Sequence, residues 1–364
     1  MTLILVTTGC WDMVEINQRL FPYSIGVDLN EGEGARYVIT ISYPNINAIG
    51  KNATQKDRVY IVSTIASSVF EGIRQLYTRL PYELYFKHLR VVVLGKNLIE
   101  DEKTIREIMD GMNRDFIINK KVRLVVAEDK AKDLLLFVPE SKRQEVIDGT
   151  IFTMLRESKD TSRYTPKTIT DFISDTDISN VTIVPRAIPN EDDIKFFGGA
   201  VFKDYSFIGN IGEIDNRGIL LMKGKVKKAL IDAHFEDVSI SYQITASKLK
   251  REIIKDGNLK IKLKIETEGT LEEYIQKEKV EANNLKKLEE MEKAIEKAIK
   301  DEVDNILEIL QKKYKADAIG IGEHISKFHP KLWKEVSKDW DQIFSEADIE
   351  IEVDAKIRRR GLMQ

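Results

Sequence analysis

The stretch LKIKLKIE, residues 259–266, alternates aliphatic and charged side chains without interruption. Successive side chains of a β-strand point to opposite faces, so this period of two predicts a strand with one buried face. The buried face would consist of Leu259, Ile261, Leu263 and Ile265. The exposed face would be mainly lysine, consisting of Lys260, Lys262, Lys264 and Glu266.

The end of the chain carries a complementary pattern. In DIEIEVDAKI, residues 348–357, aliphatic residues alternate with side chains that are mainly acidic. Oppositely charged side chains stabilise two neighbouring strands when they face each other. We therefore expect residues 259–266 and 348–357 to be neighbours in one sheet, and we expect this C-terminal sheet to be antiparallel.

A long helix is predicted between these two strands, from residue 281 to residue 314. Apolar residues recur there at spacings of three and four, which is the period of one helix face. They are Leu285, Leu288, Met291, Ile295, Ala298 or Ile299, Val303, Ile306 and Leu310. A helix of this span is about 50 Å long. Its apolar stripe needs a partner, and the sheet is the nearest candidate.

The N-terminal part predicts a mixed α/β domain. A hairpin comes first, with arms at residues 23–29 and 37–43 and a polar turn that contains Gly32 and Gly34. Glycine supplies the positive φ angles that hairpin turns need. The tip near these two glycines is also a weak candidate for contact with a partner protein.

Helices and short buried strands follow the hairpin. An apolar stripe over residues 65–80 predicts a helix that Pro81 ends. Further strands are expected at 91–94 and 122–127, and further helices at 105–112, 131–137 and, in two pieces, 141–174. The second of these pieces would open at Thr165 and Pro166, as an N-cap followed by proline at the first helical position.

The composition changes near residue 190. Pro185 and Pro189 stand next to a charged segment, residues 190–193, and proline is then absent until Pro330. Glycine-rich turns after this point predict a small β-rich middle segment. The predicted division is a truncated signal and tether (1–19), an N-terminal α/β domain (20–190), the middle segment (191–224) and a C-terminal sheet packed by the long helix (225–364). The predicted fold class is α+β with several domains.

Composition also excludes classes of protein. The chain has 364 residues, with 57 Lys and Arg against 60 Asp and Glu, and a formal net charge of −3. A dedicated nucleic-acid-binding protein is normally basic, so we expect no nucleic acid as a partner. No apolar run approaches the roughly 18 residues that span a bilayer. The single cysteine excludes an internal disulfide framework.

The usual motifs of catalytic and cofactor sites are absent from the sequence. It contains no phosphate-binding loop, no dinucleotide fingerprint, no zinc-protease motif and no nucleophile elbow. Glu323, His324 and His329 are conceivable metal ligands, but no second pair at metal-ligand spacing accompanies them. We therefore predict that the protein is not an enzyme and binds no cofactor or metal.

Two tryptophans stand seven residues apart, at Trp333 and Trp340. With Val336 and Phe344 they lie on one face of a predicted helix. This face packs on the C-terminal sheet in one interpretation. In the other it binds a partner protein, because tryptophan is enriched at binding hot spots.

The only cysteine stands in TTGCWDMVEINQ, residues 7–18. A short apolar run precedes Cys10, but no Lys or Arg does. This arrangement is typical of the end of a signal sequence whose beginning is missing. Cys10 is then either a site of lipidation or a free thiol in a terminal tail, and the residues themselves do not choose between the two.

Three groups of residues together resemble one family. They are Gly9-Cys10-Trp11-Asp12 with Glu15-Ile16-Asn17, then Phe197-Gly198-Gly199-Ala200-Val201-Phe202-Lys203, then Ile319-Gly320-Ile321-Gly322-Glu323 followed by Pro330, Trp333, Trp340 and the closing strand. Their order and spacing are similar to those of the Ger(x)C spore germination lipoproteins, the C subunits of nutrient germinant receptors. The similarity runs along nearly the whole chain.

The resemblance implies that Cys10 is acylated and that the lipid holds the protein at the outer face of the spore inner membrane. It also implies a non-catalytic subunit that contacts the A and B membrane subunits of the receptor. Thr7 departs from the family pattern, which usually has leucine three residues before the cysteine, and the upstream signal is short. The alternative is a solute-binding lipoprotein that captures a small nutrient in a cleft, with the middle segment as a hinge.

Overall fold

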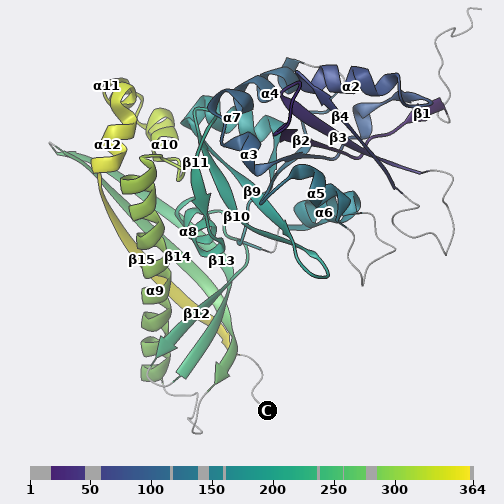
Figure 1. The fold of residues 1–364 in the computed structure, drawn as a ribbon. Coiled ribbons are helices and arrows are strands. Elements are labelled where there is room, and N and C mark those ends of the chain that lie inside the picture. Colours follow the sequence, from purple (N-terminus) through teal and green to yellow (C-terminus); the bar gives the residue numbers. More distant parts are fainter. Residues whose placement is uncertain are drawn as a thin grey trace, which may run out of the picture.

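The computed structural model describes residues 18–45, 59–114, 118–137, 147–158, 161–235, 238–256, 258–275 and 285–360. A nine-stranded sheet with helices lies toward one end of the molecule, and a four-stranded sheet crossed by a long helix lies at the other (Figure 1). This arrangement confirms the predicted α+β class, with several sheets and a C-terminal sheet packed by a long helix.

The larger sheet has the strand order β11-β10-β9-β7-β6-β2-β3-β4, and β8 pairs with β7. Its strands are β2 (Ser24–Leu29), β3 (Tyr37–Pro44), β4 (Val59–Ala66), β6 (Val91–Leu94), β7 (Arg123–Ala127), β8 (Lys167–Thr168), β9 (Val181–Pro189), β10 (Ile194–Lys203) and β11 (Ser206–Ile211). The central strands β2, β6, β7 and β9 are parallel, and antiparallel strands extend the sheet on both sides. The predicted hairpin is confirmed as β2 and β3.

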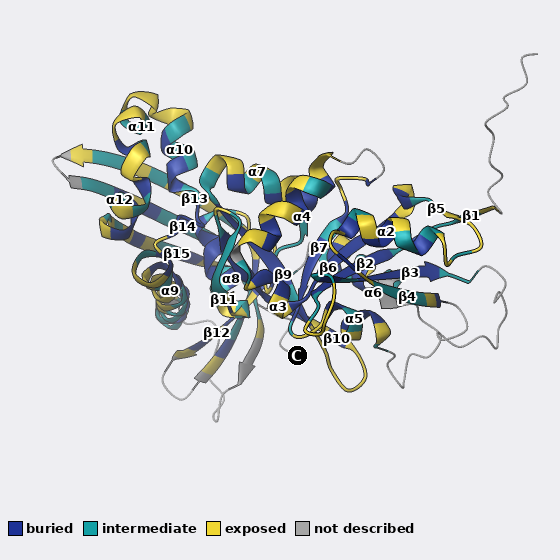
Figure 2. Ribbon diagram, turned by 45° about the horizontal axis from the view of Figure 1, so that its top comes forward, coloured by how far each residue is buried: buried dark blue, intermediate teal, exposed yellow. Residues whose placement is uncertain are grey.

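Helices cover both faces of this sheet. One hydrophobic cluster includes residues of α2 (Val69–Tyr77), α3 (Lys96–Ile99), α4 (Glu102–Arg114) and α7 (Ile169–Ser179), and another includes residues of α5 (Ala131–Leu136) and α6 (Ile147–Glu157). Within β6, Val92 and Leu94 belong to the first cluster, whereas Val91 and Val93 belong to the second. Burial on both faces is typical of parallel strands. Figure 2 shows these buried strands between helices whose outer sides are exposed.

The helix predicted from residue 65 begins later. Residues 59–66 form β4, because the β-branched run VYIVSTIA favours a strand. Helix α2 then starts at Val69, and the hydroxyl of Ser68 caps it by accepting a hydrogen bond from the backbone N–H of Glu71 at 3.1 Å.

The N-cap predicted at Thr165 is also wrong. Residues 167–168 pair with β7 as β8, so the helix cannot begin before them. Thr168 is the N-cap of α7, and it forms a capping box with Asp171. The hydroxyl of Thr165 instead donates a hydrogen bond to the side-chain oxygen of Asn216 in α8 (Glu213–Met222) at 3.1 Å.

The middle segment joins the larger sheet. Strands β10 and β11 form a hairpin that continues the sheet from β9 across residue 190, so residues 191–224 do not form a sheet of their own. Helix α8 (Glu213–Met222) follows. Residues of β9, β10 and β11 share a hydrophobic cluster with α8 and the C-terminal sheet, namely Val181, Ile183, Val201 and Ile211. One hydrophobic cluster therefore spans the junction between the larger sheet and the C-terminal sheet.

The C-terminal sheet consists of β12 (Ala229–Phe235), β13 (Val238–Asp256), β14 (Asn258–Ile275) and β15 (Asp348–Arg360), in that order. The predicted neighbours 259–266 and 348–357 are confirmed as β14 and β15, and Lys264 Nζ lies 2.6 Å from Glu352 Oε1. However, β14 and β15 are parallel, whereas the other two pairs are antiparallel as expected. The helices between β14 and β15 return the chain to the same end of the sheet, which is the crossover that parallel strands require.

The long helix is confirmed as α9 (Leu285–Glu308), which continues into the π-helical turn η4 (Ile309–Tyr314); residues 281–284 of the prediction lie outside the described ranges. The crossover then continues through α10 (Ile321–Phe328), α11 (Pro330–Val336), the 3₁₀ turn η5 (Ser337–Asp339) and α12 (Trp340–Glu346). Within the described part of the chain, no helix is both long and apolar enough to cross a membrane.

Candidate interaction site at helices α10 to α12

A buried carboxylate organises the start of α10. Asp317 is 2% exposed, and its side chain accepts backbone hydrogen bonds from Gly320 at 2.9 Å, Ile321 at 3.1 Å and Gly322 at 2.6 Å. The first N–H groups of a helix have no partner within the helix, and a negative charge there is favourable. Asp317 therefore satisfies the amino end of α10 from inside the protein.

The same carboxylate reaches α12. The indole Nε1 of Trp340 donates a hydrogen bond to Asp317 Oδ2 at 3.1 Å, and Trp340 is 7% exposed. The glycines of the GIG motif make this approach possible. Gly320 has φ +75°, and a Cβ on Gly322 would lie 2.6 Å from Trp340 Nε1. One side chain thus links two helices of the crossover.

The tryptophan pair divides between the two predicted roles. The rings of Trp333 and Trp340 make an edge-to-face contact with centroids 5.5 Å apart. Trp340 belongs to the C-terminal core together with Phe344, as the packing interpretation predicts. Trp333 is only half-buried, on the side of α11 that lines a cleft. A role of either residue in binding a partner stays a prediction.

This cleft, of about 500 Å³, lies between the end of α7 and the segment from α10 to α12. Its wall from α7 includes Asp177, and the opposite wall includes Trp333. Three more exposed or half-exposed carboxylates line it, those of Glu323, Asp339 and Asp341, against one lysine, Lys338. Because α7 packs on the larger sheet, the cleft is lined by residues from both parts of the molecule.

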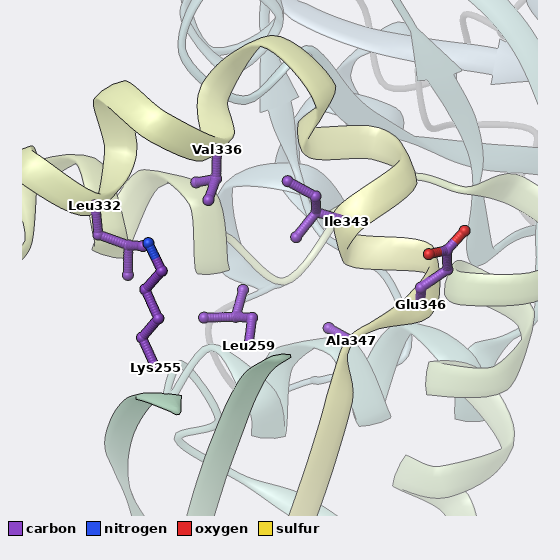
Figure 3. A pocket seen from close by; sticks show the side chains of 7 residues that line it. All are labelled: Lys255, Leu259, Leu332, Val336, Ile343, Glu346 and Ala347. Carbon is purple, nitrogen blue, oxygen red and sulfur yellow. The ribbon is translucent and has the colours of Figure 1, made fainter. Parts of the chain in front are cut away.

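A second hollow lies on the other side of α11 and α12, above the ends of β13 and β14. Figure 3 shows its apolar side chains converging from the helices and from the strand ends. The apolar lining consists of Leu259, Leu332, Val336, Ile343 and Ala347. The groove has a volume of about 290 Å³, and Lys255 and Glu346 complete its lining. Lys255 also forms an ion pair with Glu335 of α11.

Two basic groups behind Asp317 have no signal in the sequence. Arg251 of β13 donates to the carbonyl oxygen of Met222 at 3.1 Å, and burial lowers the pKa of its guanidinium. Lys223, at the end of α8, is half-buried, and burial lowers the pKa of its ammonium to about 8, with a further contribution from Lys167. Asp317 opposes both effects. In the sequence, Asp317 and Gly320 shortly before an apolar run indicate the start of a helix. Nothing in the sequence indicates that Asp317 contacts Trp340.

The remaining predicted positions are Cys10, the hairpin tip and the conceivable metal ligands Glu323, His324 and His329, and the described part of the structure does not bring them together into one site. Cys10 lies outside the described residues. The hairpin tip packs on its own domain, since Glu31 Oε2 lies 3.1 Å from Lys130 Nζ and Glu31 Oε1 accepts a hydrogen bond from Asn97. Glu323 is paired with Lys327. Across the described ranges, no three His, Cys, Asp or Glu side chains converge as metal ligands would.

The comparisons with known proteins cover the whole chain. Residues 12–187 match the model of the spore germination protein N-terminal domain, and residues 197–361 match that of the spore germination B3/GerAC-like C-terminal domain. The relatives include spore germination proteins YndF, B3 and A3 of Bacillus subtilis (strain 168). They are 25%, 23% and 25% identical over 100%, 99% and 98% of this chain and 95%, 96% and 95% of their own chains.

A solved structure has the same fold. The crystal structure of the GerBC protein matches 92% of this chain and 97% of its own, with a TM-score of 0.62 and 18% identity. Together, the two family models span most of the sequence in the order that the resemblance predicts. The chain belongs to the spore germination B3/GerAC-like family.

Proposed function

We propose that this chain is the non-catalytic lipoprotein subunit of a spore nutrient germinant receptor. A lipid on Cys10 would hold it at the outer face of the spore inner membrane, and it would act in germination by assembly and signal coupling with the A and B membrane subunits. The observation that carries this proposal is the match of both family models, in order, along residues 12–187 and 197–361.

The segment from α10 to α12 supports a role in assembly. The hydrogen bond between Trp340 and Asp317 ties α12 to the start of α10, and the segment lines the cleft on one side and the apolar groove on the other. Half-buried Trp333 offers a large aromatic surface at the cleft, which is a common form of binding hot spot. An extramembrane segment of a membrane subunit that places cationic side chains near the cleft carboxylates would fit this wall.

The deciding experiment expresses the protein from its full natural gene, beside a Cys10→Ala form. If the protein is a lipoprotein, the wild type should gain a diacylglyceryl mass and sediment with membranes, and the Cys10→Ala form should do neither. Affinity capture of the wild type should then recover both membrane subunits. If the wild type and the Cys10→Ala form are both soluble and unmodified, the proposed lipid anchor is wrong. If capture recovers neither membrane subunit, the proposed assembly role is wrong.

A second candidate is direct capture of a small nutrient. The cleft between the two parts of the molecule favours it, because its volume lies in the range of small-molecule sites and it combines aromatic and charged side chains. A ligand that binds only the folded state raises the melting temperature. A screen of amino acids and sugars that shifts the melting temperature of wild type, but not of Trp333→Ala, would favour this candidate over the first.

A further inference from the structure

The parallel strands of the larger sheet gather three distant segments at one edge. The backbone N–H of Arg90 donates to the carbonyl of Tyr23 at 2.9 Å, and that of Arg123 donates to the carbonyl of Arg90 at 2.9 Å. Tyr85 N–H donates to the carbonyl of Leu20 at 2.7 Å. Residues 18–23, 82–90 and 118–123, which precede β2, β6 and β7, therefore lie side by side. We call them the amino edge.

The amino edge is strongly cationic, although the chain as a whole has a net charge of −3. It carries six cationic side chains, Arg19, Lys87, Arg90, Lys120, Lys121 and Arg123, against one carboxylate, that of Glu83. Lys87, Lys120 and Lys121 are exposed. Among the ion pairs of the described residues, none involves any of these six cations, and the ammonium of Lys120 donates hydrogen bonds only to the uncharged oxygens of Asn113. Their positive charge is therefore not neutralised by a carboxylate.

Aromatic rings are interleaved with these cations. The guanidinium of Arg19 lies 4.6 Å from the ring centroid of Tyr85, and that of Arg90 lies 4.7 Å from the ring centroid of Tyr23. Phe21 packs edge-on against Tyr85, and Tyr82 is 45% exposed. Rings with one apolar and one polar side, next to Lys and Arg, are typical of protein surfaces at the level of lipid headgroups.

The position of Cys10 in the sequence also supports contact between the amino edge and a membrane. Cys10 precedes Arg19 by nine residues, and nine residues span at most about 30 Å when fully extended. A lipid on Cys10 would therefore keep the amino edge within that distance of the bilayer. The C-terminal sheet lies at the opposite end of the molecule (Figure 1).

We propose that the amino edge is a membrane-contacting surface that binds anionic phospholipid headgroups and orients the protein on the bilayer. The proposal rests on the proposed lipid anchor for its geometry, but the edge itself is testable without that anchor. Electrostatic attraction at an anionic surface adds up over nearby Lys and Arg side chains and weakens with salt.

The first test uses the full chain with Cys10→Ala, so that no lipid contributes. Binding is measured by co-sedimentation with vesicles of phosphatidylcholine alone and of phosphatidylcholine mixed equally with phosphatidylglycerol. We expect binding to the anionic vesicles only. The edge variant Lys87→Glu/Lys120→Glu/Lys121→Glu should lose at least about tenfold in affinity. The control Lys313→Glu/Lys331→Glu/Lys334→Glu makes the same charge change on exposed lysines of η4 and α11, none of which lines the cleft or the apolar groove, and it should bind like the parent.

The second test supplies the tether. The wild type is coupled through its single cysteine to maleimide lipid in the same two kinds of vesicle, and lysine acetylation rates are measured by mass spectrometry. Lys87, Lys120 and Lys121 should react more slowly on anionic than on neutral vesicles, while Lys331 and Lys334 should not. Equal rates on both vesicles would overturn the proposal, as would equal loss of binding by the edge and control variants.

A partner protein with an acidic segment is the competing occupant. In that case the edge variant would fail to capture a membrane subunit, yet the edge lysines would stay unprotected on anionic vesicles, and the lipid proposal would be wrong. The mass of the natural gene product tests the anchor separately, so failure of the amino edge and failure of the proposed function are distinguishable.

Discussion

The indole nitrogen of Trp340 donates a hydrogen bond to the carboxylate of Asp317 at 3.1 Å, across 23 positions of the chain. The same carboxylate holds three backbone N–H groups at the start of α10. The side chain of Asp317 is buried, and it is the acceptor for all four of these hydrogen bonds. The folding of the proposed interaction segment therefore rests on Asp317.

We expect Asp317→Ala to lower the free energy of unfolding by about 3–5 kcal/mol. The substitution leaves buried hydrogen-bond donors without an acceptor, and it removes a buried negative charge that interacts with Arg251. Asp317→Asn keeps the shape and an acceptor, so it should cost less. Urea denaturation monitored by tryptophan fluorescence measures both. An Asp317→Ala cost below about 1 kcal/mol would show that this carboxylate is not needed for stability.

The two tryptophans should separate stability from binding. Trp340→Ala removes a core side chain and a hydrogen bond, so the expected loss is about 3–5 kcal/mol of unfolding free energy. Trp333 is half-buried, and Trp333→Ala should cost less stability while reducing co-purification of the membrane subunits. Unchanged co-purification by a folded Trp333→Ala protein would contradict its proposed contact role.

Gly322→Ala should disturb the same segment by crowding. The new Cβ would lie 2.6 Å from Trp340 Nε1 and 2.9 Å from its Cε2, and a buried ring in a packed core has little room to move. We expect a loss of about 1–3 kcal/mol and a changed near-ultraviolet circular dichroism signal. Gly149→Ala in α6 is the matched control, since its Cβ would meet no atom within 4 Å. That change should be neutral or stabilising because alanine is the better helix former.

Lys223 should make stability rise with pH in the alkaline range. Burial lowers the pKa of its ammonium in the folded protein to about 8, from about 10.4 in an unfolded chain. Between these values the unfolded chain binds more protons, so the free energy of unfolding rises with pH. Lys167 and Lys225 add to the unfavourable charge, and Asp175 and Asp317 oppose it.

The measurement compares wild type with Lys223→Met in chemical denaturation from pH 7 to pH 10.5. At pH 7 the variant should be the more stable of the two, because the desolvated charge is gone. That advantage should shrink as the pH rises from 8 toward 10.4. An advantage that stays constant with pH would show that the ammonium of Lys223 is not perturbed in the folded protein.

Local patterns in the sequence were sufficient for many elements. The alternation of residues 259–266 and 348–357 predicted two strands, and their complementary charges predicted that β14 and β15 are neighbours. The alternation did not predict that the two strands are parallel, because side chains alternate in the same way along parallel and antiparallel strands. The family, likewise, followed from residues in the sequence and their order, and the comparisons confirm it.

Tertiary structure alone decided which distant residues meet. The helix expected from residue 65 starts at Val69, because the β-branched residues 59–66 find a strand partner in β3, which the sequence does not identify. Asp317, Arg251 and Trp340 converge only because β13, the turn before α10 and α12 pack together. The amino edge likewise arises from three segments that share no local pattern, since parallel pairing brings the starts of β2, β6 and β7 to one side of the sheet. Periodicity reports which face of an element is buried, whereas the partner of that face is set by packing across the whole chain.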